Sequence, residues 1–337
     1  MKDKNGNTPL IVTCSFGHLE VVKYFISIGA DKNAKNNSNE YSLLICASLN
    51  GHLEVVKYLI SIGVNKEEQN SQQYTPLICA SSNGHLDVVK YLIGIGANLA
   101  AKTKTGSSSL HLATNNGHIE TVKYLISIGA DKEQNDNENW TPLFFASSNG
   151  HIDVVKYLIS IGANKEVKSK RLNTPLLVAS YNGHIETVQY LISIGADKEE
   201  KNLIGNTPIQ CASSIDIDKY FPFFVQNNIE KNLEVIKYLI SIGADKEAKN
   251  NEGCTALSIA SSKGILKIVK YLISIRAEKE VTDNKGNTPL ILASTNNQLG
   301  VVKYLISVGA NKEAKNNEGK NALSNANGDV RDYLLTI

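Results

Sequence analysis

The sequence predicts an all-α solenoid of about ten stacked helix-turn-helix units, and three observations carry this prediction. Similar segments recur along the 337 residues at steps of 33, apart from one step of 34 and one of 48. Each segment contains two apolar stretches with helical spacing, separated by glycine, and closes with a polar connector. A period near 33 residues is typical of solenoids built from small helical pairs, because one pair cannot bury its apolar face alone.

Each unit opens on Thr-Pro-Leu or a close variant of it. The threonine hydroxyl is suited to cap the free N–H groups of a helix, and proline at the first helical position costs no hydrogen bond. We therefore expect one continuous array over residues 1–337. Its units start at Thr8, Ser42, Thr75, Ser108, Thr141, Thr174, Thr207, Thr255, Thr288 and Asn321.

Two helices follow this opening, as the third unit illustrates. The first predicted helix, PLICASSN, stops at Gly84. The second, LDVVKYLIGI, carries Leu86, Val89 and Ile93 on one face and ends at Gly96. The remaining residues, ANLAAKTKTGS, form a polar connector with a turn.

These motifs closely resemble the ankyrin repeat: TPL, Ala80, the pair Gly84-His85, then VVKYL and the pair Gly96-Ala97. The resemblance covers essentially the whole chain. It implies antiparallel helix pairs stacked side by side, with hairpin fingers projecting at right angles. The family's usual histidine after TPL is present at His111. In most other units an apolar residue replaces it, so packing replaces a local polar network, as at Ile11, Ile78, Phe144 and Leu176.

Composition restricts the functional classes. With 35 basic and 33 acidic residues, no net field favours nucleic acid or an anionic membrane. The opening MKDKNGNTPL has no apolar signal-peptide core, and apolar runs such as YLISI are too short to span a bilayer. Five cysteines without close spacing favour a reducing compartment. We expect a cytoplasmic protein with no nucleic-acid partner and no direct membrane insertion.

Most of the cysteines and histidines occupy recurring positions of the repeat, where a structural role is expected. Cys46, Cys79 and Cys211 share a first-helix column in which neighbours lie about 8–10 Å apart, too far for a disulfide. Cys14 and Cys254 are isolated. No catalytic or metal-binding motif is found, so the sequence predicts neither an enzyme nor a cofactor. Structural hydrogen bonding is expected of six histidines in the Gly-His column, namely His18, His52, His85, His118, His151 and His184.

The DKE and NKE runs after each second helix are expected to form a solvated connector surface, because their mixed charges cancel. The tyrosines of the recurring KYL motif are expected to pack between repeats. Neither column is expected to define a functional site.

Function is expected where the units differ, because shared columns are required for stacking. In ankyrin proteins the finger tips and the ends of the first helices line a concave face that binds other proteins. Large or basic side chains interrupt small polar ones there and form the predicted surface, with Tyr41, Tyr74 and Trp140 at its core and little role in folding. The candidates are Phe16, Tyr41, Leu49, Tyr74, Trp140, Lys170, Arg171, Tyr181, Leu203 and Ile204.

The finger turn also varies between units. Glycine precedes the last finger residue in six units, whereas Glu40, Gln73, Asn139 and Leu172 occupy that place in the others. If the turn requires a positive φ, the residues other than asparagine cost on the order of 1 kcal/mol each. Selection for a partner and relaxed selection in a redundant array both explain this pattern.

An insertion at residues 215–230 separates the two helices of unit seven. Its apolar residues Tyr220, Phe221, Phe223 and Phe224 either fold back over neighbouring helix ends or dock a partner. At the ends, the first unit lacks a polar outer face and the last is shortened. We therefore expect self-association through the first unit, or a longer array of which this chain is a segment.

Together these features predict a non-catalytic scaffold that binds another protein through the concave face formed by its fingers and first helices. The alternative is a regulatory ankyrin segment of a larger multidomain protein whose catalytic or channel part is absent from this sequence.

Overall fold

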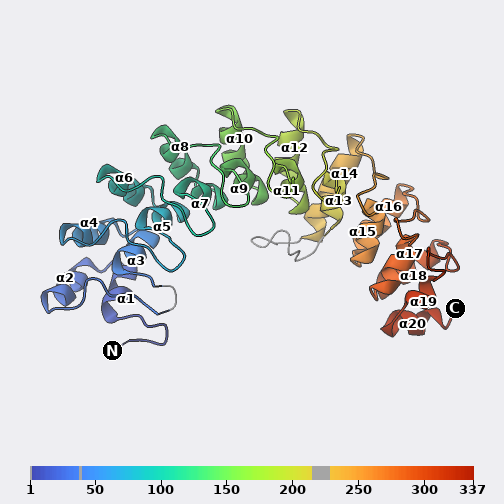
Figure 1. The fold of residues 1–337 in the computed structure, drawn as a ribbon, viewed down its shortest axis with the longest axis horizontal. Helices are drawn as coiled ribbons and strands as arrows, with labels where there is room; N and C mark the ends of the chain where they lie inside the picture. The colour runs from blue at the N-terminus through green and yellow to red at the C-terminus, as the bar shows by residue number, and fades with distance from the viewer. Residues whose placement is uncertain (1, 38–39, 215–227) are drawn as a thin grey trace. The chain divides into compact units, whose positions relative to one another are not determined.

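The computed structural model describes residues 2–37, 40–214 and 228–337, and it confirms the all-α repeat fold (Figure 1). Within these ranges there are twenty α-helices in ten pairs and no β-strand. A single isolated antiparallel bridge joins Lys35 to Ser42 in the same part of the chain.

The first helix of each pair is short. Most of these helices run over seven residues. They are α1 (Pro9–Ser15), α3 (Leu43–Leu49), α5 (Pro76–Ser82), α7 (Ser109–Asn115), α9 (Pro142–Ser148), α11 (Pro175–Tyr181), α13 (Pro208–Ser213), α15 (Ala256–Ser262), α17 (Pro289–Thr295) and α19 (Ala322–Asn325).

The second helix is longer in most pairs. These helices are α2 (Leu19–Ser27), α4 (Leu53–Ser61), α6 (Leu86–Gly94), α8 (Ile119–Ser127), α10 (Ile152–Ser160), α12 (Ile185–Ser193), α14 (Ile229–Ser241), α16 (Leu266–Ser274), α18 (Leu299–Ser307) and α20 (Gly328–Leu334).

The predicted start of each first helix is confirmed. Thr75 lies in extended conformation before α5, and its hydroxyl accepts a hydrogen bond from the Ile78 N–H at 3.2 Å, with proline at the next position. This contact satisfies one of the amide groups that a helix start leaves without a partner. The predicted stop at Gly84 is also confirmed, because its φ is +72°.

The described residues group into two compact units. The first comprises Met1–Ala146 with His151–Asn164, and the second comprises Ser147–Gly150 with Lys165–Ile337. In the first unit α1, α3, α5 and α7 pack in sequence, as do α2, α4, α6 and α8 (Figure 1). In the second unit the same two rows run through α11, α13, α15, α17 and α19 and through α12, α14, α16, α18 and α20.

The core of each repeat comes from both of its helices, but the buried face of the second helix differs from the predicted one. In the third repeat Leu77 and Ile78 of α5 are buried, as are Val88, Val89 and Leu92 of α6, whereas the predicted face residues Leu86 and Ile93 are half-buried. These residues recur at the same places in the other repeats, so each repeat buries its apolar stripe partly on its own pair and partly on the next.

The end of the insertion in unit seven is helical. Its last residues, Ile229 and Glu230, are the first two residues of α14, which is 13 residues long, whereas α12 has nine. The four candidate residues of this insertion lie outside the described residues: Tyr220, Phe221, Phe223 and Phe224. In the described part of the chain, no helix combines the length and apolar character needed to cross a membrane.

Candidate functional site

The DKE connectors link neighbouring repeats, which the sequence did not reveal. Asp245 Oδ1 accepts the Glu247 N–H at 2.9 Å and shapes the turn. Lys246 Nζ donates to the Ile275 carbonyl at the end of α16, at 2.9 Å, and Glu247 Oε1 accepts the Glu278 N–H at 3.0 Å. A cation at a helix C-terminus is favourable, because the carbonyls there carry partial negative charge. The expectation of a merely solvated surface is therefore wrong for this column.

The Gly-His column also connects repeats, as predicted. His85 Nε2 lies 3.0 Å from the Leu49 carbonyl, and His118 Nε2 lies 3.1 Å from that of Ser82. A Cβ at Gly84 would lie 2.4 Å from His118 Nδ1, so glycine is required by close approach as well as by its φ. Burial lowers the pKa of both His85 and His118, which favours the neutral imidazole.

His111 contacts the backbone of finger five. We call the segment before each first helix a finger, so finger five is residues 136–140. His111 Nδ1 accepts the Ser108 N–H at 3.1 Å, while Nε2 lies 2.8 Å from the Gln134 carbonyl and 3.1 Å from that of Trp140. The ring is fully buried, and burial lowers its pKa to about 4.

Gln210 holds the equivalent position in unit seven and makes the same contacts. Its Oε1 accepts the Thr207 N–H at 2.9 Å. Its Nε2 donates to the Ala248 carbonyl at 2.9 Å and to that of Cys254 at 2.7 Å. Histidine and glutamine at this position thus make equivalent hydrogen bonds to the backbone before the next helix. One geometry explains why either residue is found there.

Neighbouring fingers are joined through their backbones. The Leu203 N–H of finger seven (residues 202–206) donates to the Arg171 carbonyl of finger six (residues 169–173) at 2.9 Å. The same bond joins Asn251 to Ile204 at 3.1 Å and Asn284 to Glu252 at 2.9 Å. These bonds hold the tips of adjacent fingers side by side.

The residue at the tip of one finger restricts which residue stands two positions before the tip of the next finger. A Cβ at Gly205 would lie 2.3 Å from Oδ1 of Asn251 on the next finger, and one at Gly253 would lie 2.5 Å from Oδ1 of Asn284. Five tip glycines have an asparagine of the next finger at this distance: Gly6, Gly106, Gly205, Gly253 and Gly286. Where Glu40, Gln73, Asn139 or Leu172 replaces the glycine, the next finger has another residue in place of asparagine: Ser71, Lys104, Lys170 or Leu203.

The non-glycine tips adopt the predicted backbone. The φ angles are +57° at Glu40, +62° at Gln73, +60° at Asn139 and +57° at Leu172. The steric reason for the coupling is that the asparagine side chain occupies the space into which a Cβ on the preceding finger would project. In the same space Asn251 Nδ2 donates to the Leu203 carbonyl at 3.0 Å.

This coupling predicts a double-mutant cycle at finger tips six and seven. Leu172→Gly relieves the positive φ and is expected to stabilise the fold by about 1 kcal/mol. Leu203→Asn is expected to stabilise only in the Leu172→Gly background, with a coupling energy of about 1 kcal/mol between the two changes. Urea unfolding of the two single variants and the double variant measures both quantities. Strictly additive effects would contradict the steric account.

The predicted surface residues fall into three classes of exposure. Trp140 and Tyr181 are buried, with 8% and 2% of their surfaces exposed. Tyr41, Leu49, Tyr74 and Arg171 are half-buried. The exposed candidates are Phe16, Lys170, Leu203 and Ile204.

Trp140 is a packing residue, so the expectation that it contributes little to folding is wrong. Its ring centroid lies 4.6 Å from that of Phe144 and 5.3 Å from that of Phe145. Phe145 also meets His111 edge to face at 5.5 Å. The buried aromatic cluster of these four residues supports finger five. The sequence offered a clue to it, because Phe145 is the one aromatic residue in a first-helix column that otherwise holds cysteine, aliphatic residues or asparagine.

Tyr181 likewise does not present its ring to solvent. It is the last residue of α11, and its carbonyl accepts the Nδ2 of Asn232 at 2.8 Å. Asn232 replaces histidine in the Gly-His column and serves the same inter-repeat contact. Tyr181 therefore belongs to the repeat-to-repeat packing of the second compact unit rather than to an open surface.

The strongest exposed apolar group on the fingers is at fingers six and seven. Leu172, Leu203 and Ile204 are 41%, 57% and 42% exposed. Lys170 and Arg171 share the tip of finger six, and the backbone bond between Leu203 and Arg171 brings the two fingers together. We call these five residues the finger six–seven patch.

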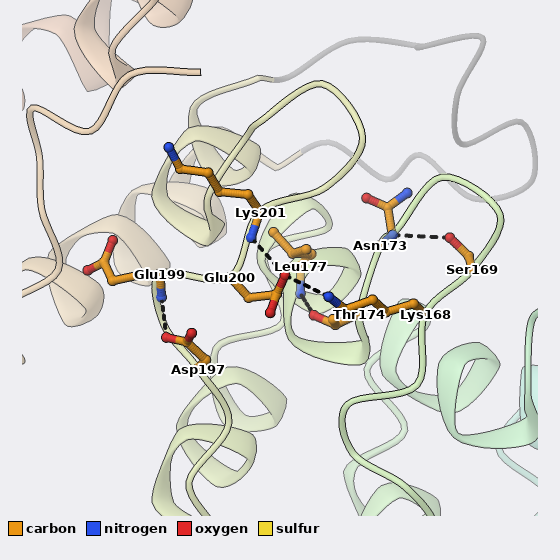
Figure 2. Close-up of polar contacts among 9 residues, drawn as sticks. All are labelled: Lys168, Ser169, Asn173, Thr174, Leu177, Asp197, Glu199, Glu200 and Lys201. Atoms are coloured by element: carbon orange, nitrogen blue, oxygen red, sulfur yellow. Dashed lines mark hydrogen bonds and ion pairs between the residues drawn. The ribbon is translucent and has the colours of Figure 1, made fainter. Parts of the chain in front are cut away.

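Polar contacts fix the base of this patch (Figure 2). Lys168 Nζ pairs with Glu200 Oε1 at 2.9 Å across the two connectors. Within finger six the Asn173 N–H donates to Ser169 Oγ at 3.2 Å, which closes the turn. The patch thus lies on a hydrogen-bonded support.

The cysteines are poorly suited to act as nucleophiles. All five cysteines are buried and free, and burial raises the pKa of Cys79 and Cys211 to about 12, which disfavours a nucleophilic thiolate. Within the described ranges no three His, Cys, Asp or Glu side chains gather as a metal site would require.

Comparison with known proteins agrees with this architecture. The family model described as ankyrin repeats (3 copies) matches residues 1–70, 28–103, 95–169 and 223–316, and the model for a single ankyrin repeat matches residues 171–203. Among solved structures, the ankyrin repeat domain of human ASB11 aligns with a TM-score of 0.56 at 24% identity, covering 71% of this chain and 99% of that chain. That likeness concerns the fold alone. A search of curated proteins gives no match. The family matches extend over most of the sequence, and the chain belongs to the ankyrin-repeat family.

Proposed function

We propose that this chain is a non-catalytic scaffold that binds another protein with the finger side of its repeats. The observation that carries the proposal is the finger six–seven patch, where Leu172, Leu203 and Ile204 are exposed beside two basic residues. Exposed aliphatic groups on a rigid support are typical of protein interfaces. In fingers eight and nine the position of Ile204 is held by charged residues, Glu252 and Lys285.

Membership of the ankyrin-repeat family supports protein binding in general, though not this particular surface, since ankyrin repeats are generally protein-interaction modules without catalytic groups. The buried, free cysteines favour a reducing, cytoplasmic setting. No observation favours the alternative of a regulatory segment within a larger enzyme or channel protein.

A polar-finger variant tests the proposal. It combines Leu172→Gly, Leu203→Asn and Ile204→Glu, so finger six gains the tip glycine of fingers eight and nine, and finger seven gains the Asn-Glu-Gly tip of finger eight. The matched control exchanges charge at the equivalent tips, as Glu252→Lys with Lys285→Glu. In pull-downs from the source cell, a partner retained by the wild type and the control is expected to be lost with the polar-finger variant. Equal retention by all three proteins would contradict the proposal.

We also propose self-association through the first repeat. Phe16 is 67% exposed at the end of α1. Val21, Tyr24 and Ile28 are 41%, 60% and 61% exposed, whereas their equivalents in the next repeat are buried (Val55) or half-buried (Tyr58 and Ile62). Sedimentation is expected to give a mass that rises above 36.7 kDa with concentration, and Phe16→Ser with Ile28→Lys is expected to suppress the rise. A constant monomer mass in the wild type would remove this proposal.

A further inference from the structure

Neighbouring repeats of this chain are joined by a recurring set of three polar contacts. The histidine of the Gly-His column meets the carbonyl at the end of the preceding first helix. Two backbone groups that follow the second helix meet the connector of the preceding repeat. Examples of the three contacts are His52 Nε2 with the Ser15 carbonyl at 2.8 Å, the Ile62 carbonyl with Lys32 Nζ at 2.7 Å, and the Asn98 N–H with Glu67 Oε1 at 2.9 Å. The side of a repeat that faces its predecessor therefore has a defined polar pattern.

The first repeat carries the same three groups without hydrogen-bond partners. His18, the Ile28 carbonyl and the Asp31 N–H hold the equivalent positions, and no hydrogen bond joins them to another described residue. His18 is exposed, whereas its equivalent His52 is half-buried. An imidazole nitrogen, a backbone acceptor and a backbone donor are thus available in the register that stacking uses.

The apolar residues on this side of the first repeat keep the same register. Val21, Tyr24 and Ile28 are 41%, 60% and 61% exposed. One repeat later the position of Val21 is held by Val55, which is 1% exposed, and α4 packs against α2 there. We call the side formed by these three residues of the first repeat and the three polar groups the leading face. It offers the contacts of an interior repeat to a neighbour that no described residue supplies.

The interfaces between repeats indicate what fits the leading face. A matching surface must present a first-helix carbonyl to His18, a lysine to the Ile28 carbonyl and a carboxylate to the Asp31 N–H. A repeat presents such a lysine and carboxylate to its successor where its connector carries consecutive Lys and Glu, as at Lys246 and Glu247. An apolar segment of another kind would cover the apolar residues but leave the polar groups buried without partners, which costs free energy.

The last repeat of a second copy fits this role poorly. Its first helix, α19, has four residues, whereas α1 has seven. The position equivalent to Ser15, whose carbonyl meets His52, is Gly328 at the start of α20. The carbonyl that His18 requires is therefore not at the end of a first helix in that repeat.

We propose that the leading face docks a repeat of the same type that belongs to another protein, one whose connector carries consecutive Lys and Glu. The lysine donates to the Ile28 carbonyl, the glutamate accepts the Asp31 N–H, and His18 contacts the end of the partner's first helix. The apolar residues pack on the partner's helices. This surface is separate from the finger six–seven patch, and it shares only its apolar residues with the proposed self-association.

A consensus-designed ankyrin protein of three repeats serves as the probe, because consensus repeats are readily designed. Its last connector reads DKEAK, as residues 245–249 do, and its last repeat has no polar cap. Sedimentation and fluorescence anisotropy with the full chain are expected to show a one-to-one complex. Site-resolved hydrogen exchange is expected to show slower exchange of the Asp31 amide in that complex, because the N–H becomes hydrogen-bonded.

A matched control probe has Ser-Ser in place of Lys-Glu in that connector and leaves the chain itself unchanged. It is expected to bind at least about tenfold more weakly, because two hydrogen bonds that involve charged groups are lost. It is also expected to leave the exchange of the Asp31 amide as fast as in the free chain.

Two lysine substitutions on α2 test the apolar part of the leading face. Val21→Lys places a charge where the equivalent residue of the next repeat is buried, so we expect it to abolish binding of the probe. Ser27→Lys adds the same charge to the same helix at a position that is exposed in both repeats, and it is expected to bind as the wild type does. Circular dichroism checks that both variants are folded.

The outcomes separate this inference from the other proposals. No binding of the probe by the wild type would overturn it. Equal binding of the two probes without protection of the Asp31 amide would also overturn it, because apolar contact alone would then explain the complex. Self-association that Val21→Lys abolishes and excess probe does not suppress would assign the face to a second copy instead. None of these results bears on the finger six–seven patch, which the pull-down tests separately.

Discussion

Replacing Trp140 by alanine is expected to lower the free energy of unfolding of the first compact unit by about 3–5 kcal/mol. The indole is 8% exposed and packs on Phe144 and Phe145, with ring centroids 4.6 and 5.3 Å away. Its removal leaves a cavity beneath finger five that the hydrogen-bonded helix start cannot fill. Urea unfolding followed by circular dichroism measures the loss.

Tyr74 provides the matched control, because it holds the same finger position in unit three and is half-buried. Tyr74→Ala is expected to cost clearly less than Trp140→Ala. Similar small losses for the two variants would contradict the assignment of Trp140 to the core, and would return it to the list of candidate binding residues.

Acidification is expected to destabilise the chain through His111. Burial lowers its folded-state pKa to about 4, while an unfolded histidine has a pKa of about 6.5. Between these values the unfolded state binds the proton and the folded state does not. The stability is therefore complete above pH 6.5, falls by about 3 kcal/mol as the pH approaches 4, and loses nothing more from this group below that.

The variant His111→Gln isolates this effect, because Gln210 already makes the same contacts in unit seven. The lowered pKa values of His85 and His118 act in the same direction in both proteins, so the difference between the two unfolding profiles reports His111. We expect the variant to have a markedly flatter profile between pH 7 and 4. Identical profiles would show that His111 is not the responsible group.

The repeat fold was predictable because the residues that start and end each helix act on their close neighbours in the sequence. Thr75 caps the helix that starts directly after it, and Gly84 ends that helix with a positive φ. The same short-range rules recur in every unit, so the helix pairs and their order follow from the sequence. The role of the Gly-His column was also predictable, since six copies in one column point to stacking.

Other features depend on contacts between units and escaped prediction. Lys246 and Glu247 have opposite charges and lie next to each other in the sequence, yet one bonds to Ile275 and the other to Glu278 of the next repeat. Trp140 is buried beside Phe145, the one aromatic residue in its first-helix column. The exposure of Leu203 and Ile204, in contrast, was expected from their place at a finger tip.

The most direct test of the binding surface is photo-crosslinking from single positions in the source cell. A benzophenone amino acid is placed at Ile204, or at the equivalent finger-tip residues Glu252 and Lys285 as controls. The Ile204 position is expected to yield a specific adduct with one protein, and Lys170→Ser with Arg171→Gln is expected to abolish it. A specific adduct from the Glu252 or Lys285 position and none from Ile204 would contradict binding at fingers six and seven.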